Sequence, residues 1–424
     1  MQNDNKLSWK IKTQITKFAS KITEGMDKVQ CRFVSEMIYG IQGAKDVKIS
    51  NIARVLNEPI KLIKTENRLC RNLEEEDLTE RINKYLCWEG AGAVNDETVL
   101  AVDLGDIRKN YAKKMDNLSR VRDGSTGEIV DGYNLCSIIG AHPYGDKIVP
   151  LYGELYSTVA EDFISENAQI LKAIKFVSAS TVGKGIFVID RGGDRREILY
   201  PLIDAELQFV VRQDGDRHIV MPGGKKCSVE YASRWCKCEV EREVEVEREG
   251  YREVKHLKLG FLPVRISERE KKQLYLVVIR GFSETPIMLL TNVEPTNEKE
   301  FCVWIADIYL TRWKCEEAYR FVKQSYNLED VRVRGYDGLR NIYILVHAVF
   351  YFVSVVIGTK AKLNLIFKKI CEKAKRFYEI ANFFQYAVAD GIHKVLFGAR
   401  SRFRTGGKEM ESTQSEFVFT RPHF

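Results

Sequence analysis

The 424-residue sequence predicts a mixed α/β protein, because segments with strand patterns alternate with segments that suit helices. The apolar run "TVLAVDL" at 98–104 is typical of a buried strand. A second apolar run, "GIFVID" at 185–190, is followed by a Gly-rich turn and a segment that suits a helix. Between 237 and 266, polar and apolar residues alternate with period two, which predicts antiparallel strands with one solvent-facing side.

The first 90 residues predict helices. Apolar residues recur at spacings of three and four in "QCRFVSEMIYGI" and in "SNIARVLN", where Ser50 is expected to act as the helix cap. Short helices joined by tight connections suit a helix-turn-helix reader of DNA. A plain helical bundle fits this segment equally well, so both interpretations of residues 1–90 stay open.

Strand patterns then define a core and an insertion. The core is expected at 91–212 and 296–360, with further strands in "GEIVDGYNLCSIIGAHP", "KIVPLYGELYS" and "AELQFVVRQDG". The period-two segment, with "QLYLVVIRG" and "PIMLLTNV" after it, defines a β-rich insertion at 213–295.

The C-terminal part is basic. From residue 345 onward there are 13 Lys and Arg against 6 Asp and Glu, which equals the whole net charge of +7. We expect a basic helical region at 361–424, of a kind that suits a polyanion such as DNA. The apolar run at 342–358 is at the short limit for a membrane span, and we interpret it as a core helix, with no membrane partner.

The ten cysteines follow no regular framework, and the first thirty residues lack the apolar segment of a secretory signal. We therefore expect a cytoplasmic protein with free thiols. Cys227, Cys236 and Cys238 are candidate zinc ligands, but they lack the paired spacing and the fourth ligand of a structural zinc site.

Three carboxylates stand out in the predicted core. Asp103 lies inside an apolar strand, Asp190 ends another strand, and Glu316 falls on a predicted helix. A buried carboxylate is costly unless it is paired or binds a metal. Two Mg²⁺ ions acting on a phosphodiester need few protein ligands beyond such carboxylates. Asp103, Asp190 and Glu316 are therefore the predicted catalytic and metal-binding residues, with Mn²⁺ as a candidate substitute.

The helix with Glu316, "YLTRWKCEEAYRFVKQ", carries a polar stripe. At about 100° per residue, Tyr309, Arg312, Glu316 and Lys323 share one side of this helix. A solvated charged face would look the same. Beside a metal-binding Glu316, however, the other three residues are predicted to bind the DNA backbone.

The Y-x2-R-x3-E-x6-K spacing resembles the signature of bacterial insertion-sequence transposases of the family numbered four, which includes the enzymes of transposons five and ten. "VLAVDLGDIRK", "VIDRGGDR", "LLTN" and this helix occur in the family's order, and the resemblance covers roughly residues 45–375. It implies a DDE transposase with a ribonuclease H-like catalytic core, a β-rich insertion and an N-terminal domain that binds the element's ends.

The resemblance also implies a mechanism. A homodimer pairs the two ends of a mobile element, cuts them with Mg²⁺ through a hairpin intermediate, and joins them to target DNA. The family's base-flipping tryptophan lies in the insertion, where Trp235 and Trp304 are candidates. Asp106, three residues after Asp103, is a competing ligand. A nuclease without strand transfer and an inactive, domesticated DNA-binding protein remain alternatives, although all three acids are present.

Overall fold

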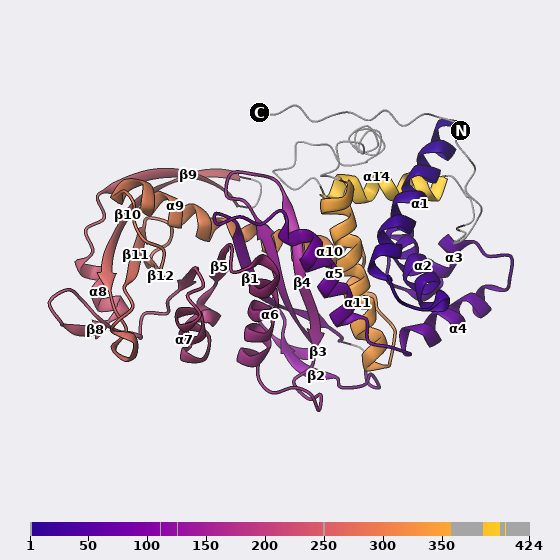
Figure 1. Ribbon diagram of the computed structural model, residues 1–424, viewed down its shortest axis with the longest axis horizontal. Helices are drawn as coiled ribbons and strands as arrows, with labels where there is room; N and C mark the ends of the chain where they lie inside the picture. Colours follow the sequence, from indigo (N-terminus) through magenta and orange to yellow (C-terminus); the bar gives the residue numbers. More distant parts are fainter. Residues whose placement is uncertain are drawn as a thin grey trace.

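A ten-stranded mixed sheet runs through the middle of the molecule (Figure 1). The computed structural model describes residues 2–110, 112–124, 126–248, 251–357, 385–398 and 403. The strand order is β2-β3-β1-β5-β6-β12-β11-β10-β9, and β4 also pairs with β3. The first six strands are β1 (Val99–Arg108), β2 (Ser119–Arg122), β3 (Ile129–Ala141), β4 (Ile148–Tyr156), β5 (Ile186–Ile189) and β6 (Phe209–Arg212).

Three neighbouring strands of the sheet, β1, β5 and β6, are parallel, whereas β3 is antiparallel to both β1 and β4. The order of this part is therefore β4-β3-β1-β5-β6. Because parallel strands end at the same edge of a sheet, the residues that follow β5 and β6 lie near the second half of β1.

The segment 213–295 contains the expected antiparallel strands. They are β9 (Val240–Arg248), β10 (Tyr251–Val264), β11 (Leu274–Arg280) and β12 (Ile287–Thr291), with a separate small pair, β7 (His218–Val220) and β8 (Lys226–Ser228). β12 pairs antiparallel with β6, so the insertion extends the core sheet instead of forming a sheet of its own. Deleting the insertion would expose the edge of β6.

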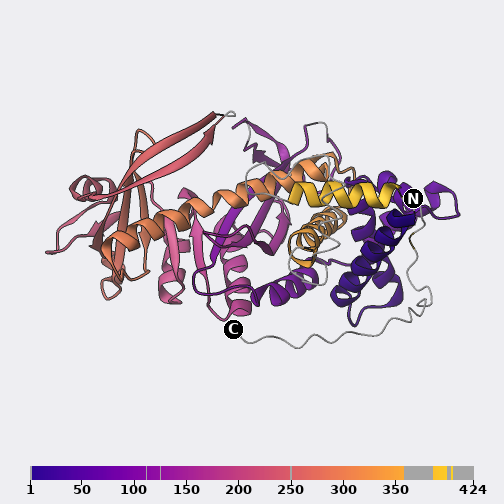
Figure 2. The same ribbon diagram turned by 90° about the horizontal axis from the view of Figure 1, so that it is seen from above.

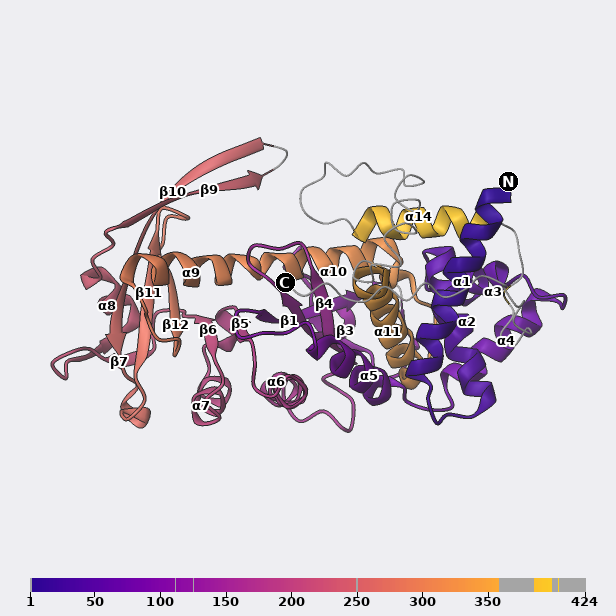
Figure 3. The ribbon, with the colours of Figure 1, turned by 45° about the horizontal axis from the view of Figure 1, so that its top comes forward.

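One long helical rod lies along the sheet (Figure 2) and consists of α9 (Glu298–Thr311) and α10 (Trp313–Ser325). α9 packs against β9, β10, β11 and β6, and α10 packs against β1. The helices α6 (Glu166–Thr181) and α7 (Arg196–Asp204) lie on the opposite face of the sheet (Figure 3). The rod therefore joins the insertion to the first strand of the core.

Five helices occupy the N-terminal region: α1 (Gln2–Ile22), α2 (Lys28–Ala44), α3 (Ile49–Leu56), α4 (Leu62–Leu73) and α5 (Thr79–Ala91). α5 packs against β4, and α2 packs against α11 (Tyr336–Tyr351), so these helices share the core of the molecule. The expectation for Ser50 was wrong, because α3 starts at Ile49 and its N-cap residue is Lys48. The side chain of Asp46 instead accepts hydrogen bonds from the Lys48 amide and from Asn51.

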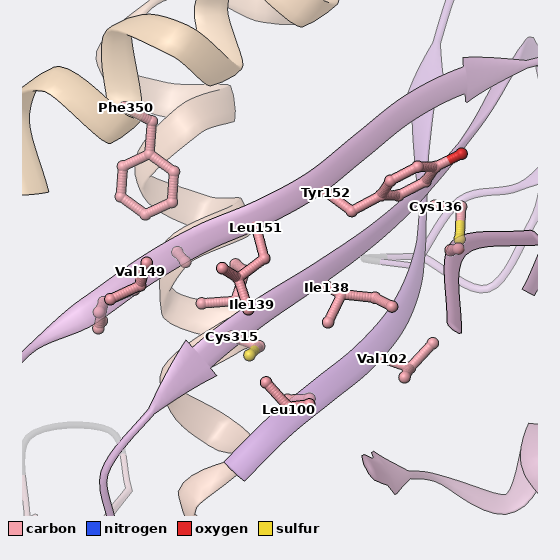
Figure 4. Close-up of a cluster of buried hydrophobic side chains, with 14 of the residues drawn as sticks. Leu100, Val102, Cys136, Ile138, Ile139, Val149, Leu151, Tyr152, Cys315 and Phe350 are labelled. Atoms are coloured by element: carbon pink, nitrogen blue, oxygen red, sulfur yellow. The ribbon is translucent and has the colours of Figure 1, made fainter. Parts of the chain in front are cut away.

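The apolar segment that has the length of a short membrane span is a core helix. α11 continues into a π-helical turn (Phe352–Val356), and within Tyr336–Val356 the most apolar window is 89% buried. Figure 4 shows Phe350 of this helix and Cys315 of α10 near side chains of β1, β3 and β4. The apolar composition of this helix therefore reflects packing inside the protein.

Most of the predicted basic region at 361–424 lies outside the described residues, except α14 (Gln385–Gly398) and Phe403. α14 packs against α2, and the Gln42 amide donates to the Ala389 carbonyl. The nine cysteines in the described parts of the chain are all free.

Candidate active site

The second half of β1 has no pairing with β5, because β5 ends beside the middle of β1. β1 and β5 pair from Val99 to Val102 only, and α10 lies beside the part of β1 that follows. The Tyr319 hydroxyl donates to the Asp103 carbonyl at 3.1 Å. A Cβ atom at Gly105 would be 2.9 Å from the Tyr319 ring. A small residue at 105 therefore lets the helix that carries Glu316 approach β1 closely.

Asp190 lies at the same edge. Val102 is the register partner of Ile189, so Asp103 and Asp190 each follow a paired residue on two neighbouring parallel strands. The Asp190 side chain accepts a hydrogen bond from the Gly192 amide at 2.9 Å and caps a short 3₁₀ turn. This capping contact fixes the carboxylate at the end of β5.

Arg312 lies between the other two acids, at the junction of α9 and α10. Its Nη2 is 2.8 Å from Glu316 Oε1, and its Nη1 is 4.0 Å from Asp103 Oδ1. The residue is only 8% exposed. Burial alone would lower the pKa of its guanidinium. The negative charges of Glu316, Asp103 and Asp190 outweigh burial, so the net effect is a raised pKa.

Asp103 itself is in an unfavourable place for a negative charge. Burial raises its pKa to about 7, Arg312 opposes this rise, and the charges of Asp190 and Glu316 add to it. Asp190 and Glu316 are therefore both close enough to Asp103 to raise its pKa, although the three residues come from two strands and a helix. The convergence of the three carboxylates on one metal site stays a prediction.

The donor chemistry of the three carboxylates fits Mg²⁺, which prefers oxygen ligands. Among the described residues, however, no group of three Asp, Glu, His or Cys side chains is arranged to hold a metal ion. Arg312 occupies the space between Asp103 and Glu316 and supplies the positive charge there. The carboxylates therefore fit a metal by their chemistry, and a change in side-chain positions is needed before they bind one together.

The remaining two residues of the stripe point to different partners. Tyr309 is 2% exposed, and its hydroxyl accepts a hydrogen bond from Arg212 of β6 at 3.3 Å. Lys323 contacts Asp106 at 3.2 Å and Glu329 at 3.4 Å. Tyr309 is thus packed inside the molecule, whereas Lys323 is partly accessible and already paired with acids.

Asp106, the competing ligand, is tied to other partners. Its carboxylate accepts a hydrogen bond from the Gly124 amide at 3.2 Å and pairs with Lys323. Asp103 is therefore the better candidate for the carboxylate cluster.

Sequence reasoning missed several residues around the site. Arg212 and Tyr319 both contact residues of the predicted site, and the spacing of Tyr319, three residues after Glu316 on one helix, was a usable signal. Asp194, within "VIDRGGDR", pairs with the buried Arg217 at 2.5 Å and so has a structural role. Trp235 is 62% exposed at the end of α8 (Val229–Trp235), whereas Trp304 is partly buried against the core.

Comparison with protein families identifies one domain. Residues 166–352 match the model of the "Transposase DDE domain" family, which supports a DDE transposase. The matched range contains Asp190 and the helix from Tyr309 to Lys323, but it begins after Asp103. Comparison with the curated proteins gave no match.

Among solved structures, a cryo-EM structure of the piggyBac transposase synaptic complex with hairpin DNA is similar over 94% of this chain and 81% of that chain, at 9% sequence identity and a TM-score of 0.42. This likeness is too distant to assign any residue of this chain.

Proposed function

We propose that this chain is a DNA transposase that cuts the ends of a mobile element and joins them to target DNA by two-metal phosphoryl transfer. The observation that supports the proposal is the position of Asp103 and Asp190 on neighbouring parallel strands, with Arg312 in contact with both Asp103 and Glu316, together with the family match over 166–352. The strand order β4-β3-β1-β5-β6, with β3 alone antiparallel, supports a ribonuclease H-like core.

In this proposal Asp103, Asp190 and Glu316 hold two Mg²⁺ ions, for which Mn²⁺ can substitute. Such ions, when bound, would supply a nucleophile at neutral pH and stabilise the leaving oxygen of an in-line displacement. Asp103 and Asp190 would hold them from fixed positions, because they lie on neighbouring parallel strands. The contact between Tyr319 and β1 keeps Glu316 of the adjacent helix close to both.

The basic residues of the helix bind and orient the phosphate. Arg312 has five N–H donors in a planar group, so its guanidinium suits two oxygens of one phosphate. Lys323, eleven residues or about three helical turns further along, suits another phosphate as a point charge. Tyr309 is buried, so we assign it a supporting role: it packs beneath Arg312 and reaches DNA only if the helix moves.

The finer features follow from the resemblance to insertion-sequence transposases of the family numbered four. They are cut-and-paste transposition through a hairpin intermediate, a homodimer that pairs terminal inverted repeats, and a cytoplasmic, nucleoid-associated location in a bacterium. We carry them over as parts of the proposal.

The experiment that tests the function uses DNA from the flanks of the gene, end-labelled and incubated with the protein, Mg²⁺ and a supercoiled plasmid. A transposase produces cut ends and then labelled plasmid with the end covalently joined. Cutting without joined product would point to a nuclease. Binding without cutting would point to an inactive DNA-binding protein.

A further inference from the structure

A hollow of about 800 Å³ lies beside the far end of β1. One wall is the end of β1 and the described parts of its connection to β2, residues 108–110 and 112–115, and the other is the segment 329–334 that follows α10. Six of the lining residues are basic and two are acidic: Arg108, Lys109, Lys113, Lys114, Arg332 and Arg334 face Glu329 and Asp330. The hollow is therefore strongly basic.

The two acids of the hollow are already neutralised. Arg108 contacts Glu329 at 3.0 Å, and Lys323 contacts the same carboxylate at 3.4 Å. Lys48 pairs with Asp330 at 2.6 Å. The negative charges therefore do not cancel the remaining cations.

Four cations line the hollow without such partners. Lys113, Lys114, Arg332 and Arg334 are exposed, and within the described parts of the chain none of them has an acidic group within 4 Å. Four exposed like charges around one hollow repel one another, and this arrangement favours a polyanion.

The walls of the hollow are held in place by a buried lysine. Lys109 is 5% exposed, and its ammonium group donates to the carbonyls of Glu329 and Val331. The Asp116 amide also donates to the Arg334 carbonyl at 3.0 Å. Because both walls are cross-linked, the spacing of the exposed cations is set before any ligand binds.

A contact links the wall of the hollow to the helix of the candidate active site. Lys323 contacts Glu329 in the wall of the hollow and lies on the same helix as Glu316. Along β1, Asp103 and Arg108 are five residues apart, or about 17 Å at about 3.3 Å per residue. At about 3.4 Å per base pair, this distance corresponds to about five base pairs of duplex DNA.

We propose that this hollow, bounded by 108–110, 112–115 and 329–334, binds the sugar-phosphate backbone of duplex DNA about five base pairs from the phosphate that is cut. The inference rests on the proposed function and adds a second contact to it. The backbone could belong to the element end or to the target DNA, and the experiment separates these two sources.

The test uses two double variants, Lys113→Ala/Lys114→Ala and Arg332→Ala/Arg334→Ala. The matched control is Lys175→Ala/Lys184→Ala, because Lys175 on α6 and Lys184 before β5 are exposed, and α6 lies on the other face of the sheet (Figure 3). The removed side chains are exposed and form no ion pair with the residues that the structure describes, so all three variants should fold. Circular dichroism and thermal unfolding verify this.

Salt titration of binding is measured separately with element-end DNA and with target DNA offered to the cut complex. Each phosphate contact contributes about 0.9 to the slope of log K against log salt. Each double variant in the hollow should reduce the magnitude of this negative slope by about 1.8 for one of the two DNAs. The Lys175→Ala/Lys184→Ala control should leave the slopes for both DNAs unchanged. Ethylation of phosphates about five base pairs from the cut should interfere with wild-type binding and lose its effect in the variants.

A lowered slope with end DNA assigns the hollow to the element, and a lowered slope with target DNA assigns it to the target. Wild-type slopes and unchanged interference in both double variants would overturn the inference. If the wild-type protein neither binds nor cuts DNA, the proposed function itself fails, and this outcome is distinct because it appears before any variant is compared.

Discussion

Replacing Arg312 with glutamine removes the only cation that lies between Asp103 and Glu316 among the described residues. The attraction between unit charges 4 Å apart is about 4 kcal/mol at an effective dielectric constant of about 20. The Asp103 side chain is only 18% exposed, so most of this attraction is retained in the Arg312–Asp103 pair. Glu316 is 49% exposed, so the Arg312–Glu316 pair contributes about 1 kcal/mol or less. Part of the loss is recovered when Asp103 takes up a proton.

We therefore expect Arg312→Gln to lower the free energy of unfolding by about 3 kcal/mol at pH 8 in EDTA, in the range for breaking a buried pair. Asp103 has a pKa raised to about 7 by burial, and losing Arg312 raises it further. A carboxyl group with a raised pKa in the folded state destabilises the protein as pH rises through that pKa. The loss should therefore be smaller at pH 6 than at pH 8.

Urea unfolding at both pH values measures this effect. The matched control is Arg320→Gln, which breaks an exposed pair with Glu317 on the same helix and should cost less than about 1 kcal/mol. Adding Ca²⁺, which fits oxygen ligands without supporting the reaction, should stabilise Arg312→Gln more than the wild type, because the ion replaces the missing charge. Equal losses in the two variants, independent of pH, would refute the reasoning about Arg312.

Three further predictions concern the same site. Gly105→Ala places a Cβ atom 2.9 Å from the Tyr319 ring, so it should lower the free energy of unfolding by about 1–3 kcal/mol and slow DNA cutting. Wild-type stability in an unfolding assay together with a wild-type cleavage rate would contradict the close packing. Lys323→Ala should lower the salt slope of end-DNA binding by about 0.9 while the Mg²⁺ concentration needed for cutting stays the same; an unchanged slope would mean that Lys323 serves only its acidic partners. Arg312→Lys keeps the charge but loses the planar pair of donors, so single-turnover cutting should fall at least about tenfold with little change in salt slope, and a wild-type rate would argue against phosphate orientation.

The sequence was sufficient to predict the elements on which Asp103, Asp190 and Glu316 lie, for a physical reason. Asp103 and Asp190 each interrupt or end an apolar strand, and such strands pair in parallel at the centre of an α/β sheet. The spacing of Arg312 and Glu316 corresponds to one helical turn, and the structure has this contact at 2.8 Å. Local periodicity thus carried the information about each element.

Contacts between distant elements were not predictable in the same way. Nothing in the spacing of Tyr309 shows that Arg212 approaches its hydroxyl, and the alternation in 237–266 does not reveal that β12 continues the core sheet beside β6. The four residues of the stripe were also predicted to bind metal and DNA from one side of a single helix, whereas the turn at the α9–α10 junction and close packing bury Tyr309 and Arg312. Burial depends on the whole fold, so periodicity alone could not separate buried from exposed members of the stripe.

The central claim is that Asp103, Asp190 and Glu316 act as one catalytic centre on DNA. The most direct measurement is single-turnover cutting and joining of element-end DNA in Mg²⁺ by the wild type and by Asp103→Asn, Asp190→Asn and Glu316→Gln, with DNA binding measured beside it. Each of the three substitutions should abolish both cutting and joining while end binding stays within about twofold of the wild type, because DNA affinity comes mainly from basic residues. Cutting at the wild-type rate by any one of the three variants would contradict the claim.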